Sequence, residues 1–242
     1  MHPLIEKVID TGEGLSKDEA LHLAYNLDEC ELEAGADVVR AKWCGSDFDF
    51  CAIINGKSGA CSEDCKYCAQ SHHYRAHIEE YPLLKSQDIV NDALLKTEQG
   101  VRRYSVVTSG RALTDEEIDA LCDTYAHIAD VSDIFLCASL GLLTKAQFEK
   151  LYASGVRRYH NNLETSRRFF PHVCTTHSYD DKLKTIALAR EVGFEICSGG
   201  IIGLGETVED RVDMALTLRD LEVVSIPLNV LNPIAHTPFE NN

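Results

Sequence analysis

The sequence predicts an α/β fold, a TIM-type (β/α) barrel with a helical N-terminal extension, and two observations support it. From residue 50 onward, short apolar runs alternate with amphipathic helical segments, a pattern typical of parallel strands joined by right-handed crossovers. Six such strand and helix units follow one another. A complete eight-unit barrel takes roughly 250 residues, so we expect about six of the eight units in this chain.

Apolar runs and amphipathic segments give the expected elements in order. The strands are expected at 50–54, 103–107, 134–138, 157–162, 194–198 and 223–229. The helices are expected at 86–99, 114–128, 144–154, 178–192 and 206–220. Three helices have a capping residue at their start, namely Thr114, Thr144 and Ser178. Three are followed by a glycine suited to end a helix, namely Gly100, Gly155 and Gly193.

Residues 1–45 form a helical extension in this prediction, and residues 46–242 form the barrel. Within the extension, Ser16 is suited to cap a helix, with Glu19 three residues further on, as in a capping box. The sequence stops soon after the sixth expected strand. We therefore expect a barrel that is truncated at its C-terminal side.

Composition and charge exclude several classes of function. The chain has 242 residues, 45% of them hydrophobic, and a net charge of −16 from 39 acidic and 23 basic residues, which disfavours nucleic acid as a partner. No secretory pattern opens the sequence and no run approaches about 18 apolar residues, so we expect no membrane segment. Ten cysteines without a secretory signal indicate metal ligation or reduced thiols in a cytoplasmic protein.

Three cysteines, Cys61, Cys65 and Cys68, form a C-x3-C-x2-C motif directly after the first expected strand. In a parallel barrel this is where the active-site loops lie. Three thiolates anchor three irons of a [4Fe–4S] cluster and leave the fourth iron open to a chelating substrate. The amino and carboxylate groups of S-adenosylmethionine suit that position, and one electron then releases a 5′-deoxyadenosyl radical.

Two alternative readings of this motif remain. A zinc site would take His72 or His73 as a further ligand, and unliganded structural thiols would need no metal. Zinc sites usually pair two C-x2-C units, whereas this triplet is isolated. The position after a barrel strand favours the iron–sulfur cluster.

Polar side chains also occupy strand positions that are apolar in an ordinary barrel. They are Arg103, Ser105, Cys137, Asn162, Glu164, Cys197 and Asn229. Burying such groups without partners costs about 1–3 kcal/mol each, so we expect them to line one cavity that binds ligands. If the strand faces were misassigned, they would instead face the helices. The remaining thiols, Cys30, Cys122 and Cys174, are expected to be ordinary buried or surface cysteines.

Several segments closely resemble the biotin synthases, a family of radical S-adenosylmethionine enzymes. They are CAIINGKSGACSEDCKYCAQS, ASLGLLT, NNLETSRRFFP, CTTHSYDDKLKTI, CSGGIIGLGET and SIPLNVLNPIAHTP. The resemblance runs from about residue 40 to the end. It implies insertion of sulfur between two saturated carbons of dethiobiotin, in which deoxyadenosyl radicals remove the hydrogens and an auxiliary iron–sulfur cluster gives up the sulfur.

The resemblance also assigns roles to residues. It makes Cys61, Cys65 and Cys68 the ligands of the [4Fe–4S] cluster, and Cys137 and Cys197 ligands of the auxiliary cluster. Asn162 and Glu164 match residues that contact the cofactor's ribose and help to hold dethiobiotin. The remaining expected residues are Asn229 as a dethiobiotin contact, Lys182 near the cofactor carboxylate, Tyr67 beside the cluster, Arg103 in the active site and Lys57 before the cysteine loop.

Two departures from the family concern the auxiliary cluster. The third auxiliary cysteine of the family falls on Ser105, and a hydroxyl is a much poorer iron ligand than a thiolate. An arginine ligand lies in barrel strands beyond this sequence. We therefore expect a variant of the [2Fe–2S] cluster, with Cys51, Cys44 or both as replacement ligands, unless these two are core thiols. A smaller departure is the order His160-Asn161.

The expected function is thus biotin synthase, a sulfurtransferase. The expected partners are dethiobiotin, an electron donor such as flavodoxin or ferredoxin, and a second copy in a homodimer. Three alternatives remain: a radical enzyme of the same barrel type with another small substrate, a catalytically inactive fragment, and a metal-binding protein.

Overall fold

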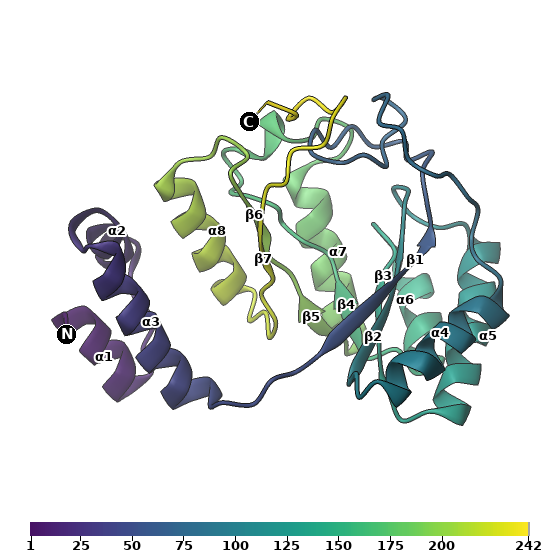
Figure 1. The fold of residues 1–242 in the computed structure, drawn as a ribbon, viewed down its shortest axis with the longest axis horizontal. Coiled ribbons are helices and arrows are strands. Elements are labelled where there is room, and N and C mark those ends of the chain that lie inside the picture. Colours follow the sequence, from purple (N-terminus) through teal and green to yellow (C-terminus); the bar gives the residue numbers. More distant parts are fainter. Residues whose placement is uncertain (242) are drawn as a thin grey trace.

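The computed structural model describes residues 1–241 and has an α/β architecture (Figure 1). The strands are β1 (Cys51–Lys57), β2 (Arg103–Thr108), β3 (Phe135–Ser139), β4 (Arg158–His160), β5 (Glu195–Cys197), β6 (Gly200–Ile202) and β7 (Leu228–Val230). The helices are α1 (Pro3–Thr11), α2 (Lys17–Asn26), α3 (Glu29–Cys44), α4 (Ser86–Glu98), α5 (Asp115–Val131), α6 (Lys145–Ala153), α7 (Tyr179–Val192) and α8 (Val208–Asp220), with a 3-10 turn η1 (Phe170–His172).

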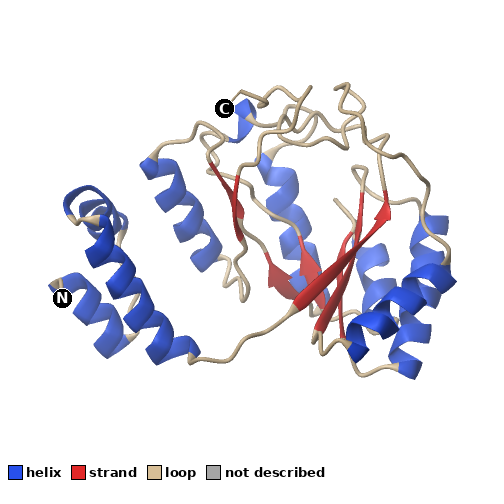
Figure 2. Ribbon diagram, in the orientation of Figure 1, coloured by secondary structure: helices blue, strands red, loops and turns tan. Residues whose placement is uncertain are grey.

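All strand pairings within the named strands are parallel, which confirms the predicted barrel-type fold. Strands β1 to β5 form one sheet in chain order, and β6 pairs with β7 in a second sheet. Helices α4, α5, α6 and α7 follow one another around the outside of the larger sheet, each in contact with the next (Figure 2). The carboxyl ends of the strands therefore meet on one side of the molecule, where long loops gather.

Local signals place the helices as predicted. Thr114, Thr144 and Ser178 each complete a capping box at the start of α5, α6 and α7. Gly193 caps the end of α7 with a φ of 110°, a left-handed conformation that glycine adopts without steric penalty. These interactions involve residues within one helical turn of each other, so the sequence alone reveals them.

The prediction of a sixth strand at 223–229 is wrong. The structure has β7 only at Leu228–Val230, and adds β6, which was not predicted. Pro227 has no N–H to donate to a sheet, and it interrupts the expected strand just before β7 begins. Upstream of it, only Ser225 pairs with β5, through a single bridge to Cys197. The fourth strand is also shorter than predicted, because the chain leaves the sheet after His160.

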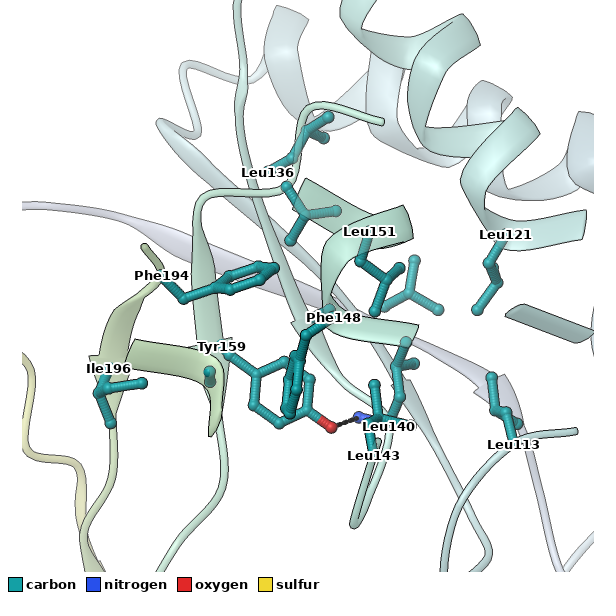
Figure 3. Close-up of a cluster of buried hydrophobic side chains, with 14 of the residues drawn as sticks. Leu113, Leu121, Leu136, Leu140, Leu143, Phe148, Leu151, Tyr159, Phe194 and Ile196 are labelled. Carbon is teal, nitrogen blue, oxygen red and sulfur yellow. Dashed lines mark hydrogen bonds between the residues drawn. The ribbon is translucent and has the colours of Figure 1, made fainter. Parts of the chain in front are cut away.

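The main core lies between the sheet and helices α4 to α8, and Figure 3 shows part of it. Phe148, Tyr159 and Phe194 pack edge to face at its centre, with ring centroids of Phe148 and Tyr159 4.7 Å apart. The Tyr159 hydroxyl accepts a hydrogen bond from the Leu140 backbone at 3.3 Å. This packing holds the ends of β3 and β4, from which several site residues project.

The first three helices form a group at the N-terminal side, joined to β1 by an extended segment (Figure 1). Ser16 caps α2 in a capping box with Glu19, as predicted. Helix α2 lies beside α8, where the Tyr25 hydroxyl donates to Glu209 at 2.5 Å. The division into an extension at 1–45 and a barrel at 46–242 stays a prediction. Within residues 1–241, no helix is both long and apolar enough to cross a membrane.

Candidate functional site

The loop after β1 carries the three cysteines of the C-x3-C-x2-C motif, and its own backbone holds it in shape. The Cys61 N–H donates to Gln70 O at 3.0 Å, and His72 N–H donates to Cys61 O at 2.9 Å. A further turn links Cys68 N–H to Cys65 O at 3.0 Å. The three sulfurs are thus presented by a preformed loop at the carboxyl end of the sheet.

A cavity of about 260 Å³ lies under this loop. Seven of the predicted site residues line it, namely Cys61, Cys65, Tyr67, Cys68, Asn162, Glu164 and Lys182. They come from the cysteine loop, the segment after β4 and helix α7. The structure therefore brings together residues that lie more than 100 positions apart in the sequence.

Several polar groups of this cavity have no protein partner. The Glu164 Oε2 atom is buried and makes no hydrogen bond. Lys182 is only 8% exposed, and its ammonium makes no hydrogen bond or ion pair with the part of the chain described. Since an unpaired buried charge is costly, the cavity is built for a ligand that satisfies both. A zwitterionic cofactor with ribose hydroxyls fits that requirement.

The thiols of the loop are suited to bind metal. A hydrogen bond with Cys174, together with burial, raises the pKa of the Cys65 thiol above its usual value. Burial likewise raises the pKa of Cys68. A buried thiol without a cation stays protonated, whereas a bound metal ion deprotonates it outright. Three thiols in one loop, with none paired in a disulfide, match the donor set of a [4Fe–4S] cluster with one open iron.

Tyr67 is directed at the acidic residue of the cavity. Its hydroxyl is hydrogen-bonded to Glu164, and burial, together with the nearby negative charges, raises the pKa of Tyr67 well above its usual value. The phenol therefore stays neutral and donates a hydrogen bond. This contact orients the Glu164 carboxylate.

The backbone of the segment after β4 is held in an unusual conformation. Glu164 has a φ of 71°, which is uncommon for a residue other than glycine. Its N–H donates to Gly199 O at 3.0 Å, and its carbonyl accepts from Ile201 N–H at 2.9 Å. A Cβ atom at Gly200 would lie 2.5 Å from Glu164 O. Glycine is therefore required here so that the strand end can approach the acidic residue closely.

A second group of thiols lies on strands β1, β3 and β5 and does not line this cavity. Cys51, Cys137 and Cys197 are close enough for their charges to interact, and burial raises the pKa of Cys137 to about 12. Arg103 and Arg158 lie in the same group and act on these thiols. The Nη1 atom of Arg103 is buried without a hydrogen-bond partner. Three thiols with two neighbouring guanidinium groups fit an anionic iron–sulfur cluster.

The other predicted site residues do not line the cavity either. Ser105 neighbours Cys137 in strand register, and its buried hydroxyl has no partner. Cys44 is exposed at the end of α3. Asn229 lies on β7, whose residues are exposed, and Lys57 forms an ion pair with Glu117 at 2.6 Å. The polar strand residues thus fall into two groups rather than lining one cavity.

Sequence reasoning had not singled out three further residues of the cavity, Glu63, Arg111 and His177. Their sequence signal is weak because each comes from a different segment. His177 follows Cys174 with the spacing C-x-x-H, although only Cys174 was considered, and it was expected to be an ordinary thiol. In the structure both residues are buried beside the cysteine loop.

Comparison with known proteins decides the family. The family model of the Radical SAM superfamily matches residues 57–218. A biotin synthase of Clostridium botulinum (strain Hall) is 56% identical over 236 residues, which cover 98% of this chain and 74% of that protein. The chain belongs to the biotin synthase family. A biotin synthase of Akkermansia muciniphila is 53% identical over 98% of this chain and 73% of its own length.

Solved structures support the same fold for this biotin synthase family member. Methylornithine synthase superposes with a TM-score of 0.86 at 18% identity, over 99% of this chain and 71% of that one. HydG, a maturase of the [FeFe]-hydrogenase, gives 0.82 at 21% identity, over 98% of this chain and 56% of that one. The predicted family and the radical S-adenosylmethionine barrel are both confirmed.

Proposed function

We propose that this chain has biotin synthase activity, inserting sulfur into dethiobiotin by radical chemistry. The observation that carries this proposal is the convergence on one cavity of the three loop thiols, the Lys182 ammonium and the Glu164 carboxylate, whose Oε2 atom has no hydrogen-bond partner. When bound, a [4Fe–4S] cluster with S-adenosylmethionine supplies a 5′-deoxyadenosyl radical, and an auxiliary cluster supplies the sulfur. Cys61, Cys65 and Cys68 would hold the first cluster.

The residues of the cavity have separate tasks in this proposal. The Lys182 ammonium neutralises the cofactor carboxylate, and the Glu164 carboxylate accepts hydrogen bonds from ribose hydroxyls, oriented by Tyr67. The Asn162 side chain contacts the cofactor and the substrate with its remaining hydrogen-bonding capacity, since its Oδ1 already accepts from Gly199 N–H at 2.9 Å. Burial of these groups excludes water from a site where a radical would otherwise be quenched.

For the auxiliary cluster we propose Cys51, Cys137 and Cys197 as ligands. Cys51 replaces the cysteine that the family has at Ser105. Cys51 and Cys44 are both exposed, and Cys51 is favoured because its thiol interacts with Cys137 and Cys197. Arg103 and Arg158, which form ion pairs with Asp49 and Glu195, also act on these thiols and would offset part of the negative charge of three thiolates. Asn229 remains a proposed dethiobiotin contact.

Further parts of the proposal concern partners and location. An electron donor such as flavodoxin or ferredoxin would supply the electron, and the active form would be a homodimer. The ten free cysteines suit the reducing cytoplasm.

The experiment is anaerobic turnover of the protein reconstituted with iron and sulfide. With a reductant, it should convert S-adenosylmethionine to 5′-deoxyadenosine in a dethiobiotin-dependent manner. Cys65→Ala should abolish this conversion, and Cys122→Ala, which changes a thiol outside both groups, is the matched control. Undiminished turnover in Cys65→Ala would contradict the cluster assignment. A colourless protein without iron would support a zinc-binding role instead.

A further inference from the structure

Next to the cysteine loop lies a second set of metal-ligating side chains that the proposed reaction does not use. Cys174 and His177 lie between η1 and α7 and are 3% and 9% exposed. The Cys174 Sγ atom is 3.2 Å from His177 Nδ1. One ligand atom each of Cys65, Cys174 and His177 lies within 4.8 Å of the others. Two sulfurs and one imidazole nitrogen therefore converge on one point.

This donor set is typical of a single tetrahedral ion. Zinc binds sulfur at about 2.3 Å and imidazole nitrogen at about 2.0–2.1 Å, which puts neighbouring ligand atoms roughly 3.5–4 Å apart. The Cys174 Sγ–His177 Nδ1 distance of 3.2 Å is already slightly shorter than this, and the distances to Cys65, at most 4.8 Å, need to shorten by about 1 Å or less to meet that geometry. The spacing Cys174-x-x-His177 is also a common ligand spacing on one loop.

The surroundings of the histidine match those of a metal ligand. Its Nδ1 is hydrogen-bonded to the buried Glu63 carboxylate, the kind of contact that orients metal-binding histidines. Its Nε2 is buried and has no hydrogen-bond partner. A buried ring nitrogen without a partner, on a histidine whose other nitrogen lies 3.2 Å from the Cys174 sulfur, is a second observation, independent of the spacing, that indicates a ligand.

The two loops are fixed to each other before any ion binds. Asp64 accepts hydrogen bonds from Thr175 N–H at 2.8 Å and Thr176 N–H at 3.1 Å. Lys66 N–H donates to Val173 O at 3.0 Å. Binding an ion therefore requires little ordering of the chain, which favours affinity.

We propose that, in the cluster-free protein, Cys65, Cys174 and His177 bind one divalent ion of the zinc type. Binding forms two metal–sulfur bonds and one metal–nitrogen bond, and any proton that either sulfur still carries passes to solvent. Because the proposed function makes Cys65 a ligand of the [4Fe–4S] cluster as well, ion and cluster exclude each other. The site thus holds the protein in an inactive state until the ion leaves.

Cobalt is a suitable probe because tetrahedral Co²⁺ with thiolate ligands absorbs strongly in the visible range. The protein for this experiment is the full chain with Cys51→Ala and Cys197→Ala, which remove two of the three thiols proposed for the auxiliary cluster. Its iron is removed under anaerobic conditions. We expect one Co²⁺ per chain with sulfur charge-transfer bands. Cys174→Ser, which keeps the side-chain shape but offers a poor ligand, and His177→Ala should each weaken binding at least about 100-fold.

The controls are Cys61→Ala, which removes a cluster ligand but not this site, and Cys122→Ala. Both should bind Co²⁺ like the parent. Unchanged affinity in Cys174→Ser, or loss of binding in Cys61→Ala, would overturn the proposal, because the ion would then lie on the three loop cysteines.

Competition between zinc and cluster assembly tests directly whether the ion and the [4Fe–4S] cluster exclude each other. With all ten cysteines present, one equivalent of Zn²⁺ should slow cluster assembly from iron and sulfide about tenfold or more, and Cys174→Ser should remove that effect. Equal slowing in both proteins would contradict the proposal. Neither measurement depends on turnover, so a chain that behaves as expected here yet makes no 5′-deoxyadenosine would contradict the proposed function alone.

Discussion

The side-chain oxygen of Asn162 accepts a hydrogen bond from the backbone N–H of Gly199 at 2.9 Å. This contact ties the segment after β4 to the turn between β5 and β6, and both are buried. It also sets the position of the amide that we propose to contact cofactor and substrate. The turn also has no room for a side chain at residue 199, because the backbone of Pro227 lies against it.

Gly199→Ala should therefore destabilise the protein. A Cβ atom there would lie 1.9 Å from Pro227 O, a backbone atom that cannot move aside easily. We expect a loss of about 1–3 kcal/mol in the free energy of unfolding, the usual cost of overpacking, measured by urea denaturation. Gly14→Ala is the control, since its nearest neighbour is the flexible Arg219 side chain at 3.1 Å. Equal unfolding midpoints for the two variants would refute the packing argument.

Lys182→Ala should weaken binding of S-adenosylmethionine. A charge-assisted hydrogen bond contributes about 1.5–3 kcal/mol, so we expect KM for this cofactor to rise about 10-fold to 100-fold while kcat changes less. Lys182→Arg should recover part of the affinity. Lys184→Ala, an exposed lysine on the same helix, should leave KM unchanged. An unaltered KM in Lys182→Ala would remove this residue from the cofactor site.

Cys51→Ala should reduce the iron content of the reconstituted protein, because it removes one of three thiols proposed to hold the auxiliary cluster. The [4Fe–4S] signal from the loop cysteines should persist in electron paramagnetic resonance after reduction. Cys44→Ala should retain full iron, since Cys44 ends α3 and is not among the thiols that act on Cys137. If Cys51→Ala kept the parent's iron content, the replacement-ligand hypothesis would be wrong for this residue.

Asp210→Asn should lower stability in a pH-dependent manner. Burial alone would raise the pKa of Asp210, but hydrogen bonds from Arg168, Ser166 and Thr207 outweigh it and hold that pKa below its ordinary value. The carboxylate therefore stabilises the fold above the unfolded pKa of about 3.9, and this contribution is lost as the pH falls toward the folded value.

We expect Asp210→Asn to lose about 1–3 kcal/mol at pH 7, and the gap to the parent to narrow between pH 4 and pH 3. Urea denaturation across this range measures it. Asp220→Asn, whose carboxyl is 71% exposed, is the control and should show little effect at either pH. A constant gap from pH 7 to pH 3 would show that the charge of Asp210 does not stabilise the fold.

The sequence by itself determined the alternation of strands and helices, most helix ends and the cysteine loop. These features depend on contacts within one turn or on a short motif, as in the capping boxes of Thr114, Thr144 and Ser178. Asn162 and Glu164 were predicted because they follow a strand of the parallel fold, and Tyr67 and Lys182 were expected from the family resemblance, whereas Glu63, Arg111 and His177 were not predicted. The C-terminal strand was misplaced because a single proline outweighed the apolar pattern around it.

Only the tertiary structure decided which side chains meet. It separated the polar strand residues into two groups, favoured Cys51 over Cys44, and placed Cys174 and His177 beside Cys65. Cys65 and Cys174, for example, come from loops that lie more than 100 positions apart. Such contacts depend on how the β1 and β4 loops fold over the strand ends, and no local pattern of residues encodes that arrangement.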